Sequence, residues 1–385
     1  MSLIVIALVL LAALAGGWLL LRSRSAAPPM RPTKAPAARP LRTPIPLVRP
    51  AGPAPTLVPD PLPDLPPEAL GSFNWRVAED LPAEHRDALV TAVRRIPRPP
   101  AALHQMLSPQ FLDRASSNAL SELITGEAQI AAKVLATVNA PYYGLQRPVS
   151  GIGQAVTFLG LNTVRSICLQ YLLEDAFKPT HPAQKQVHAE IWNASALASE
   201  LCSRLCAKLG LADAGALVAQ VLLSFLGHLA TATLLAGQPG PTGARLSVGP
   251  LLDRTRAAQD QLGLGPAEIG ALLLQEWGLP DAIVNEVRAI DRLLVTPAGQ
   301  RSAEDSQRLA VAHLCARLGE HLATGGPVSA GGLAGLAAGQ AQAEDGFHLR
   351  AHLAAPALAR LPEHLQAADL ALALQTLQQG MQARR

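Results

Sequence analysis

The chemistry open to this chain depends first on its histidines, because imidazole is both a common general base and the commonest metal ligand. The ten histidines are followed by Arg, Gln, Pro, Ala or Leu, and none is followed by Asp. The chain also lacks a Cys-x-x-Cys pair, a glycine-rich phosphate loop and a recognisable Ser-His-Asp arrangement. The sequence therefore contains no complete motif for hydrolysis, phosphate binding or redox chemistry.

One histidine needs separate treatment. His228 lies in a strongly apolar stretch four residues after Ser224, which places the two side chains on one helical face. A role in a pocket is one interpretation, and a buried histidine bonded to a backbone carbonyl is the more ordinary one. His104 and His188 have no carboxylate at helical spacing that would predict a proton relay.

The cysteines and the paired carboxylates have structural interpretations. Cys202 and Cys206 lie four residues apart on one helical face, but a zinc site usually draws on a second ligand cluster, which this chain lacks. We therefore expect buried, unreactive thiols, with a metal or redox pair as the alternative. Glu174-Asp175 and Glu344-Asp345 are adjacent carboxylates, and adjacent residues on a helix point apart.

The composition predicts an all-α protein. Hydrophobic residues make up 49% of the 385 residues and aromatic residues only 3%, with Ala and Leu dominant. Ala and Leu are strong helix formers, whereas strands favour the aromatic and β-branched residues that are scarce here. The net charge of +3 is too small to indicate nucleic-acid binding, and none is expected.

The chain begins with a candidate membrane anchor. Residues 2–21 carry no charge, and about twenty residues of helix span the hydrocarbon core of a bilayer. A cleavable signal peptide is the alternative, because Ala13-Leu14-Ala15 offers small residues, but no basic residue precedes the apolar run. The basic residues that follow the run are Arg22, Arg24, Arg31, Lys34, Arg39, Arg42 and Arg49. They predict a single-pass anchor over residues 1–24 with the C-terminal side in the cytoplasm.

A proline-rich linker is expected over residues 25–72. Fifteen prolines fall between Ala26 and Pro67, and the segment has almost no helical or strand periodicity. Such a segment buries too little apolar surface to order itself. We predict a disordered spacer between the membrane and a helical domain over residues 73–323.

Apolar periodicity places the helices of that domain. The helix over residues 128–138 has Ile130, Val134 and Val138 at a spacing of four, and a turn-rich segment follows it. A second helix begins at Ile152 and is broken at Gly160, after which Asn162 is a candidate cap for a third. The other expected helices cover residues 83–95, 101–107, 117–124, 187–208, 214–235 and 304–322.

Three sequence segments resemble the HDOD domain, an output module related to the HD metal-dependent phosphohydrolases. They are VNAPYYG over residues 138–144, RPVSGIGQAV over residues 147–156 and LGLNTVR over residues 159–165. The later turn Trp277-Gly278-Leu279-Pro280 is also similar, so the resemblance covers residues 96–322. It implies an HD-domain-like helical bundle, followed here by a Gly/Ala-rich segment, expected to be mobile over residues 324–340, and a C-terminal helix over residues 357–382.

The resemblance also implies that the metal site has been lost, as in HDOD domains generally. Where related catalytic domains carry the His-Asp pair, this chain has Ser224 and Phe225, and Asn193 stands where a histidine is expected upstream. Phenylalanine has no lone pair for a metal, and serine is a poor substitute for imidazole. We therefore expect no catalytic residue, no metal and no cofactor.

Candidate interaction residues lie in the resembling segments. Asn139, Tyr142 and Tyr143 either line a groove or cap a helix and pack its turn. Arg147 and Arg165 either pair with an acidic or phosphorylated partner, or are solvated or bound in an internal salt bridge. Glu127-Ala128 and Ala140 depart from the usual residues of the family, which affects local recognition more than fold.

The sequence thus predicts a non-catalytic regulatory protein in a bacterial inner membrane. The resemblance implies signalling through a protein partner, and the partner must be a separate chain because no receiver, cyclase or phosphodiesterase module is present. A structural or assembly factor of an envelope complex is the first alternative. A residual metal-dependent phosphohydrolase is the second.

Overall fold

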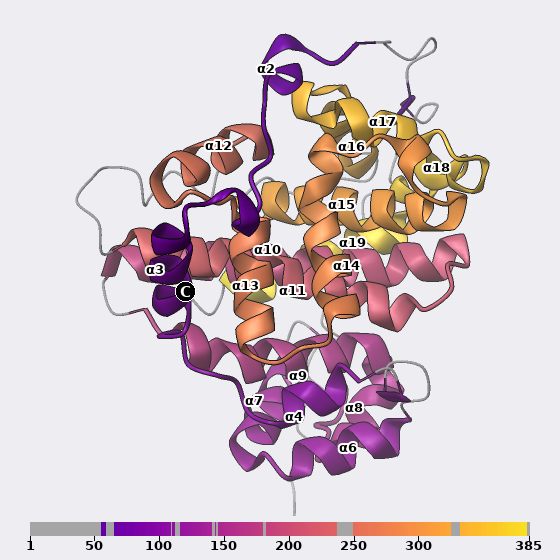
Figure 1. Cartoon of the computed structure of the whole chain (residues 1–385). Coiled ribbons are helices and arrows are strands. Elements are labelled where there is room, and N and C mark those ends of the chain that lie inside the picture. The colour runs from indigo at the N-terminus through magenta and orange to yellow at the C-terminus, as the bar shows by residue number, and fades with distance from the viewer. Residues whose placement is uncertain are drawn as a thin grey trace, which may run out of the picture. The chain divides into compact units, whose positions relative to one another are not determined.

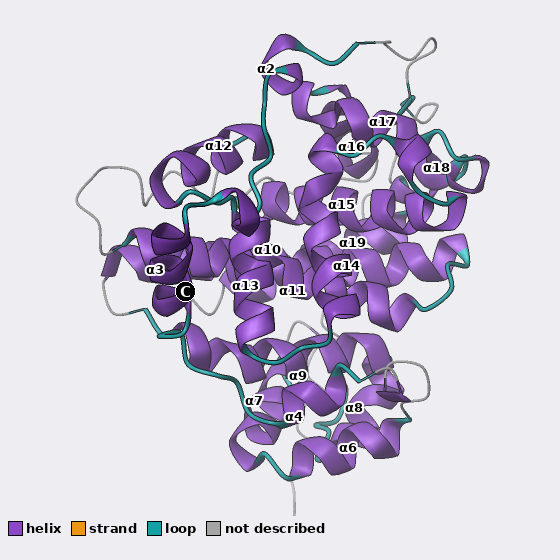
Figure 2. Ribbon diagram, in the orientation of Figure 1, coloured by secondary structure: helices purple, strands orange, loops and turns teal. Residues whose placement is uncertain are grey.

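In the residues that the structure describes, helices make up all of the regular structure and no strand occurs (Figure 2). The computed structural model describes residues 55–58, 65–108, 110–111, 116–140, 143, 145–179, 182–236, 249–324 and 332–382. The all-α prediction is confirmed for these residues. The predicted anchor over residues 1–24 and most of the predicted linker lie outside them.

The first half of the described chain contains short helices and the second half contains the longest ones. The early helices are α2 (Glu68–Gly71), α3 (Ala83–Val93), α4 (Ala102–Met106), α6 (Ser117–Thr125), α7 (Ala128–Val138), α8 (Ile152–Leu159) and α9 (Leu161–Glu174). The later helices are α10 (Pro182–Leu209), α11 (Ala214–Leu235), α12 (Leu251–Leu262), α13 (Pro266–Glu276), α14 (Asp281–Arg292), α15 (Ala303–Ala323), α16 (Gly332–Gln342), α17 (Phe347–Leu353), α18 (Leu361–Leu365) and α19 (Ala368–Gln382).

Local sequence signals set several helix ends. The Ser302 side chain accepts a hydrogen bond from the backbone of Asp305 at 3.1 Å and so caps α15. Gly160 has a φ of 84°, which a residue with a Cβ rarely adopts, and it separates α8 from α9. The predicted cap at Asn162 is wrong, because α9 already begins at Leu161 and leaves Asn162 within the first turn.

Helix α11 lies at the centre of the bundle and contacts α10, α13, α14 and α15 (Figure 1). It is apolar on all sides, which is the pattern of a fully buried helix. Among the described residues it is the one helix long and apolar enough to cross a membrane, but 89% of its most apolar window is buried in the bundle. Its composition therefore reflects a core position.

Two glycines let α11 and α13 approach closely. A Cβ on Gly270 of α13 would lie 2.9 Å from the Cα of Gly227, and a Cβ on Gly227 would overlap the backbone oxygen of Pro266. Real Cβ atoms do not reach such distances, so the backbones of the two helices touch here. This contact fixes where α11 lies relative to α13.

The folded region is longer at both ends than the sequence predicts. Leu57 and Leu70, within the predicted disordered linker, are each only 4% exposed. The Gly/Ala-rich segment, expected to be mobile, forms α16 from Gly332 onward, and its apolar side chains join the main core. The predicted single C-terminal helix is instead two helices, α18 and α19. All of these elements fall in one compact unit, Pro50–Arg385, which is expected to fold without residues 1–49.

Candidate functional site

The segment after α7 is closed by the side chain of Asn139. Its Nδ2 donates a hydrogen bond to the backbone oxygen of Val149 at 2.9 Å, and its Oδ1 accepts one from the backbone nitrogen of Val149 at 2.8 Å. The amide thus pairs with Val149 as a backbone group would and fixes the loop between α7 and α8. This geometry favours the structural interpretation of Asn139 over a groove residue.

The other loop residues lie in different environments. Tyr143 is half-buried and lines a cavity described below, whereas Tyr142 lies outside the described residues. Arg147 is exposed, so it is accessible to a partner. Of the four predicted interaction residues that the structure describes, Tyr143 lines that cavity, and Asn139, Arg147 and Arg165 do not.

Arg165 is buried, so the expected solvation is wrong, and its hydrogen-bond acceptor is a neutral amide where a salt bridge was the other expectation. Its side chain is 1% exposed, and its Nη2 donates a hydrogen bond to Asn162 Oδ1 at 2.7 Å. Burial lowers the pKa of the guanidinium to about 10. The guanidinium packs where a Cβ on Gly215 would overlap it, so it locks α9 against the start of α11. A residue in this position supports the fold and cannot reach an external partner.

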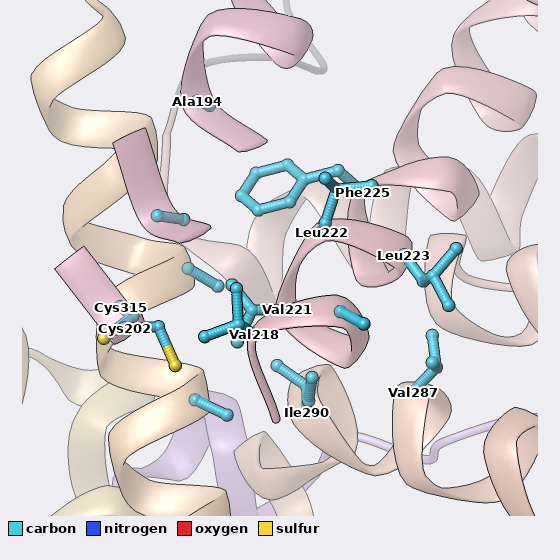
Figure 3. Close-up of a cluster of buried hydrophobic side chains, with 14 of the residues drawn as sticks. Ala194, Cys202, Val218, Val221, Leu222, Leu223, Phe225, Val287, Ile290 and Cys315 are labelled. Atoms are coloured by element: carbon cyan, nitrogen blue, oxygen red, sulfur yellow. The ribbon is translucent and has the colours of Figure 1, made fainter. Parts of the chain in front are cut away.

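The positions expected to be degenerate metal ligands are filled by packing. Phe225 is 2% exposed and lies beside Leu222 among buried apolar side chains (Figure 3). The Ser224 hydroxyl donates a hydrogen bond to the backbone oxygen of Val221 within α11 at 2.8 Å. Asn193 of α10 is half-buried and does not line the small cavity beside Phe225.

His228, one turn further along α11, is paired with a carboxylate. Its Nε2 lies 2.9 Å from Oδ2 of Asp291 on α14, and both side chains are at most 5% exposed. The Nη2 of Arg317 on α15 donates a hydrogen bond to Asp291 Oδ1 at 3.0 Å. The sequence-based expectation that His228 bonds a backbone carbonyl is therefore wrong, because the partner comes from a helix 63 residues away.

The polar cluster continues from Arg317 to two further charged residues. Arg317 Nη1 forms an ion pair with Glu320 Oε2 at 3.0 Å, without hydrogen-bond geometry. Arg254 of α12 donates two hydrogen bonds to the same carboxylate, from Nη1 to Oε1 at 3.0 Å and from Nη2 to Oε2 at 2.7 Å. We call His228, Asp291, Arg317, Glu320 and Arg254 the buried ionic cluster.

Electrostatics keep both carboxylates of the cluster ionised. Burial alone would raise the pKa of Asp291, but Arg317 and His228 outweigh burial and hold that pKa below its ordinary value. Burial is likewise outweighed at Glu320, where Arg254 and Arg317 lower the pKa. Two cations thus balance two anions inside the bundle, which is the condition for burying charges at tolerable cost.

The fold and the filled ligand positions agree with the match of this chain to a known family. The HDOD domain family matches residues 96–293, just over half of the chain. The chain belongs to the HDOD domain family. The resemblance expected over residues 96–322 is thereby confirmed for residues 96–293.

Solved structures similar to this HDOD protein come from several bacteria. An HDOD domain protein of unknown function from Geobacter sulfurreducens is 16% identical, with a TM-score of 0.48 over 76% of this chain and 98% of that chain. A Shewanella amazonensis protein provisionally named a phosphohydrolase is 22% identical, with a TM-score of 0.42 over 69% of this chain and 98% of that one. A Marinobacter aquaeolei protein provisionally named for signal transduction is 20% identical, with a TM-score of 0.47 over 78% and 65% of the two chains. No curated protein matches the chain.

Because HDOD domains are related to metal-dependent HD proteins, the site has to be tested for a fit to a divalent metal. Its residues do not fit one. Within the described part of the chain, no group of three or more His, Cys, Asp or Glu side chains is placed to hold a metal ion. The two carboxylates that could contribute are already bound to Arg317 and Arg254. A divalent cation would have to displace these guanidinium groups, which are themselves at most 5% exposed.

The space beside His228 also limits what the HDOD site can do. A histidine oriented by a carboxylate can serve as a general base when a substrate reaches it. The cavity between His228, Phe225 and α10 has a volume of only about 10 Å³. That is room for about one water molecule, far below the roughly 300–1,000 Å³ of a typical ligand pocket.

The cysteines of the HDOD fold are structural in this arrangement. The Sγ atoms of Cys202 and Cys206 lie 3.8 Å apart, and all four cysteines are buried. The hydrogen bond to Cys202, together with burial, raises the pKa of the Cys206 thiol. A thiol that stays protonated is a weak nucleophile and a weak metal ligand.

Sequence reasoning missed most of the buried ionic cluster. A signal was present, because Asp291 directly follows the buried Ile290 and lies two residues before the buried Leu293. A charged residue at a core position predicts a buried partner. The partners themselves come from α11 and α15, and no spacing within one helix identifies them.

Proposed function

We propose that this chain is a membrane-anchored HDOD protein that regulates a partner by binding it and catalyses no reaction itself. The observation that supports the proposal most directly is the filled site. Phe225 packs where a metal ligand is expected, and Arg317 and Arg254 neutralise the nearby carboxylates. A site that already holds its own cations has no need of a metal.

The membrane part of the proposal rests on the amino-terminal sequence. Residues 2–21 are uncharged, and the following segment is basic up to Asp60. Under the positive-inside rule this pattern puts the HDOD domain in the bacterial cytoplasm. A proline-rich spacer of about forty residues would then let the domain reach a partner near the inner membrane.

Metal content and hydrolytic activity test the catalytic question. The fragment Pro50–Arg385 would be assayed for bound transition metal and for hydrolysis of phosphodiester substrates with added Mn²⁺ or Mg²⁺. We expect less than one tenth of an equivalent of metal and no metal-dependent turnover. A matched variant, Ser224→His with Phe225→Asp, introduces the His-Asp pair and shows whether these two metal ligands alone are enough for metal binding. Stoichiometric metal with turnover in the natural sequence would refute the proposal.

Partner capture tests the binding role. The full-length chain, expressed in a bacterium and extracted from its membranes, would be used to isolate bound proteins. Arg147→Glu reverses an exposed charge in the HDOD loop, and Arg360→Glu reverses one outside the family-matched region. We expect the first variant to lose the partner and the second to retain it. Retention by both would remove this loop from the binding surface, and recovery of the chain in the soluble fraction would contradict the anchor.

A further inference from the structure

A cavity of about 470 Å³ lies outside the buried ionic cluster, between α9, α10 and α19. Its floor and walls are mostly apolar and include Ile167, Ala196, Leu222, Leu377 and Met381. Ligand pockets in proteins usually have volumes of about 300–1,000 Å³ and mainly apolar linings. This cavity has the size and surface of such a pocket, and neither the family match nor the proposed partner binding accounts for it.

The polar side chains around the cavity are already engaged with each other. The hydroxyls of Thr137 and Tyr171 lie 2.6 Å apart. The Glu200 carboxylate accepts a hydrogen bond from Thr163 at 3.1 Å and another from Arg204 Nε at 2.6 Å. Both oxygens of Glu200 are therefore used, and its charge is balanced by Arg204.

The charge of Asp369, in the first turn of α19, is balanced in the same way. Asp369 lines the cavity and pairs with Lys208 at 2.8 Å. The Nε2 of Gln170, another lining residue, donates a hydrogen bond to the backbone oxygen of Trp192 at 3.0 Å. An ionic ligand would thus gain no unpaired counter-charge here and would lose its hydration, which is costly. The lining selects for an uncharged occupant.

The mouth of the cavity carries exposed apolar side chains. Phe158 on α8 is 63% exposed and Leu372 on α19 is 65% exposed, and both line the cavity. Within the described residues they are two of only three large hydrophobic side chains that are exposed. Two of the three tyrosines of the chain, Tyr143 and Tyr171, also line it. The cavity thus has three aromatic side chains in its lining, and such side chains pack well against a ligand that contains a ring.

We propose that this cavity is a binding site for an uncharged, mainly apolar small molecule that contains an aromatic or aliphatic ring. The site depends on α19, which supplies one wall and lies beyond the family-matched residues 96–293. Helix α19 is held by the Asp369 ion pair and by a hydrogen bond from Gln378 to the backbone oxygen of Leu322 at 2.9 Å. The inference does not require that the proposed partner binding be correct.

Two dyes that differ by one charged group test the inference on the fragment Pro50–Arg385. N-phenyl-1-naphthylamine is uncharged, and 8-anilinonaphthalene-1-sulfonate carries the same rings with a sulfonate. Titration followed by fluorescence should show saturable binding of the uncharged dye at one site, at least tenfold tighter than binding of the sulfonate.

Cavity-filling variants locate the binding. Ala373→Phe fills the cavity from α19 and Ser166→Phe fills it from α9, whereas Gln379→Phe adds the same ring at an exposed position of α19. We expect the two filling variants to bind the uncharged dye at least tenfold more weakly than the natural sequence does. The control should bind the dye with the affinity of the natural sequence. Circular dichroism and thermal melting show which variants fold. If Ala373→Phe does not fold, the dye affinity of Ser166→Phe provides the test.

Three results would overturn the proposal. They are an absence of saturable binding by the uncharged dye, equal affinity for both dyes, and unchanged binding in a folded filling variant. If the uncharged dye fails to bind while full-length Ala373→Phe loses a captured protein partner, the cavity is a protein docking site instead. The metal and hydrolysis assays are unaffected by these outcomes, so failure here is distinguishable from failure of the proposed function.

Discussion

Acid should destabilise this domain through His313, a fully buried histidine on α15. Its Nδ1 lies 2.7 Å from the backbone oxygen of Ile290, and burial followed by the nearby Arg317 lowers its pKa from 6.5 to about 4. Because the unfolded chain takes up this proton more readily than the folded one, the stability from His313 is complete above about pH 6.5 and is lost as the pH falls toward 4. Between pH 7.5 and pH 5 the loss amounts to about 2 kcal/mol.

Urea unfolding of Pro50–Arg385 at a series of pH values measures this loss. His313→Asn keeps a donor near the Ile290 oxygen but removes the titrating group, so it serves as the matched control. Other buried histidines, such as His188 and His352, have pKa values lowered by burial and act in the same direction. The quantity of interest is therefore the difference in the free energy of unfolding between the natural sequence and His313→Asn. We expect this difference to narrow by about 2 kcal/mol as the pH falls from 7.5 to 5. Parallel curves from pH 7.5 to pH 5 would refute the assignment of this pH dependence to His313.

Three further substitutions should change the free energy of unfolding in urea. Gly227→Ala forces a Cβ against the backbone of Pro266 and should cost about 3 kcal/mol or more, and wild-type stability would show that the helices can separate. Arg317→Met removes the main counter-charge of the buried Asp291 and should cost roughly 3–5 kcal/mol, so a cost below 1 kcal/mol would contradict the cluster. Asn139→Ala removes both hydrogen bonds to the following loop and should cost about 1–2 kcal/mol, with a neutral result indicating that water replaces them.

Helices with strong local patterns could be predicted from the sequence to the residue. The predicted bounds of α7 and α11 match the structure, because α7 has clear apolar periodicity and α11 is continuously apolar. The prediction failed at Gly332–Gln342, where glycine and alanine suggested mobility. There the small side chains let α16 pack on α15 and α17, and that contact is set by tertiary structure.

Only those features of the candidate site that neighbouring residues define could be predicted from the sequence. The Ser224-Phe225 replacement is visible in the sequence because two adjacent residues define it. Arg165 was misjudged, because its burial depends on the space left by Gly215, fifty residues later. The pairing of His228 with Asp291 depends on how α11 and α14 pack, and no spacing within either helix encodes that pairing.

The close packing of α16–α19 on the bundle has a consequence for how this domain could be inherited or recombined. The family match ends at residue 293, but the apolar core continues without a break through Leu333, Leu349 and Leu374. A chain cut at the family boundary would lose α15, the helix that makes the most extensive contact with α10, and would expose the matching face of α10 to water. In this protein the region that shares one apolar core is therefore longer than the region that the family match covers. Any fusion to another domain has to join beyond α19 or before the buried Leu57.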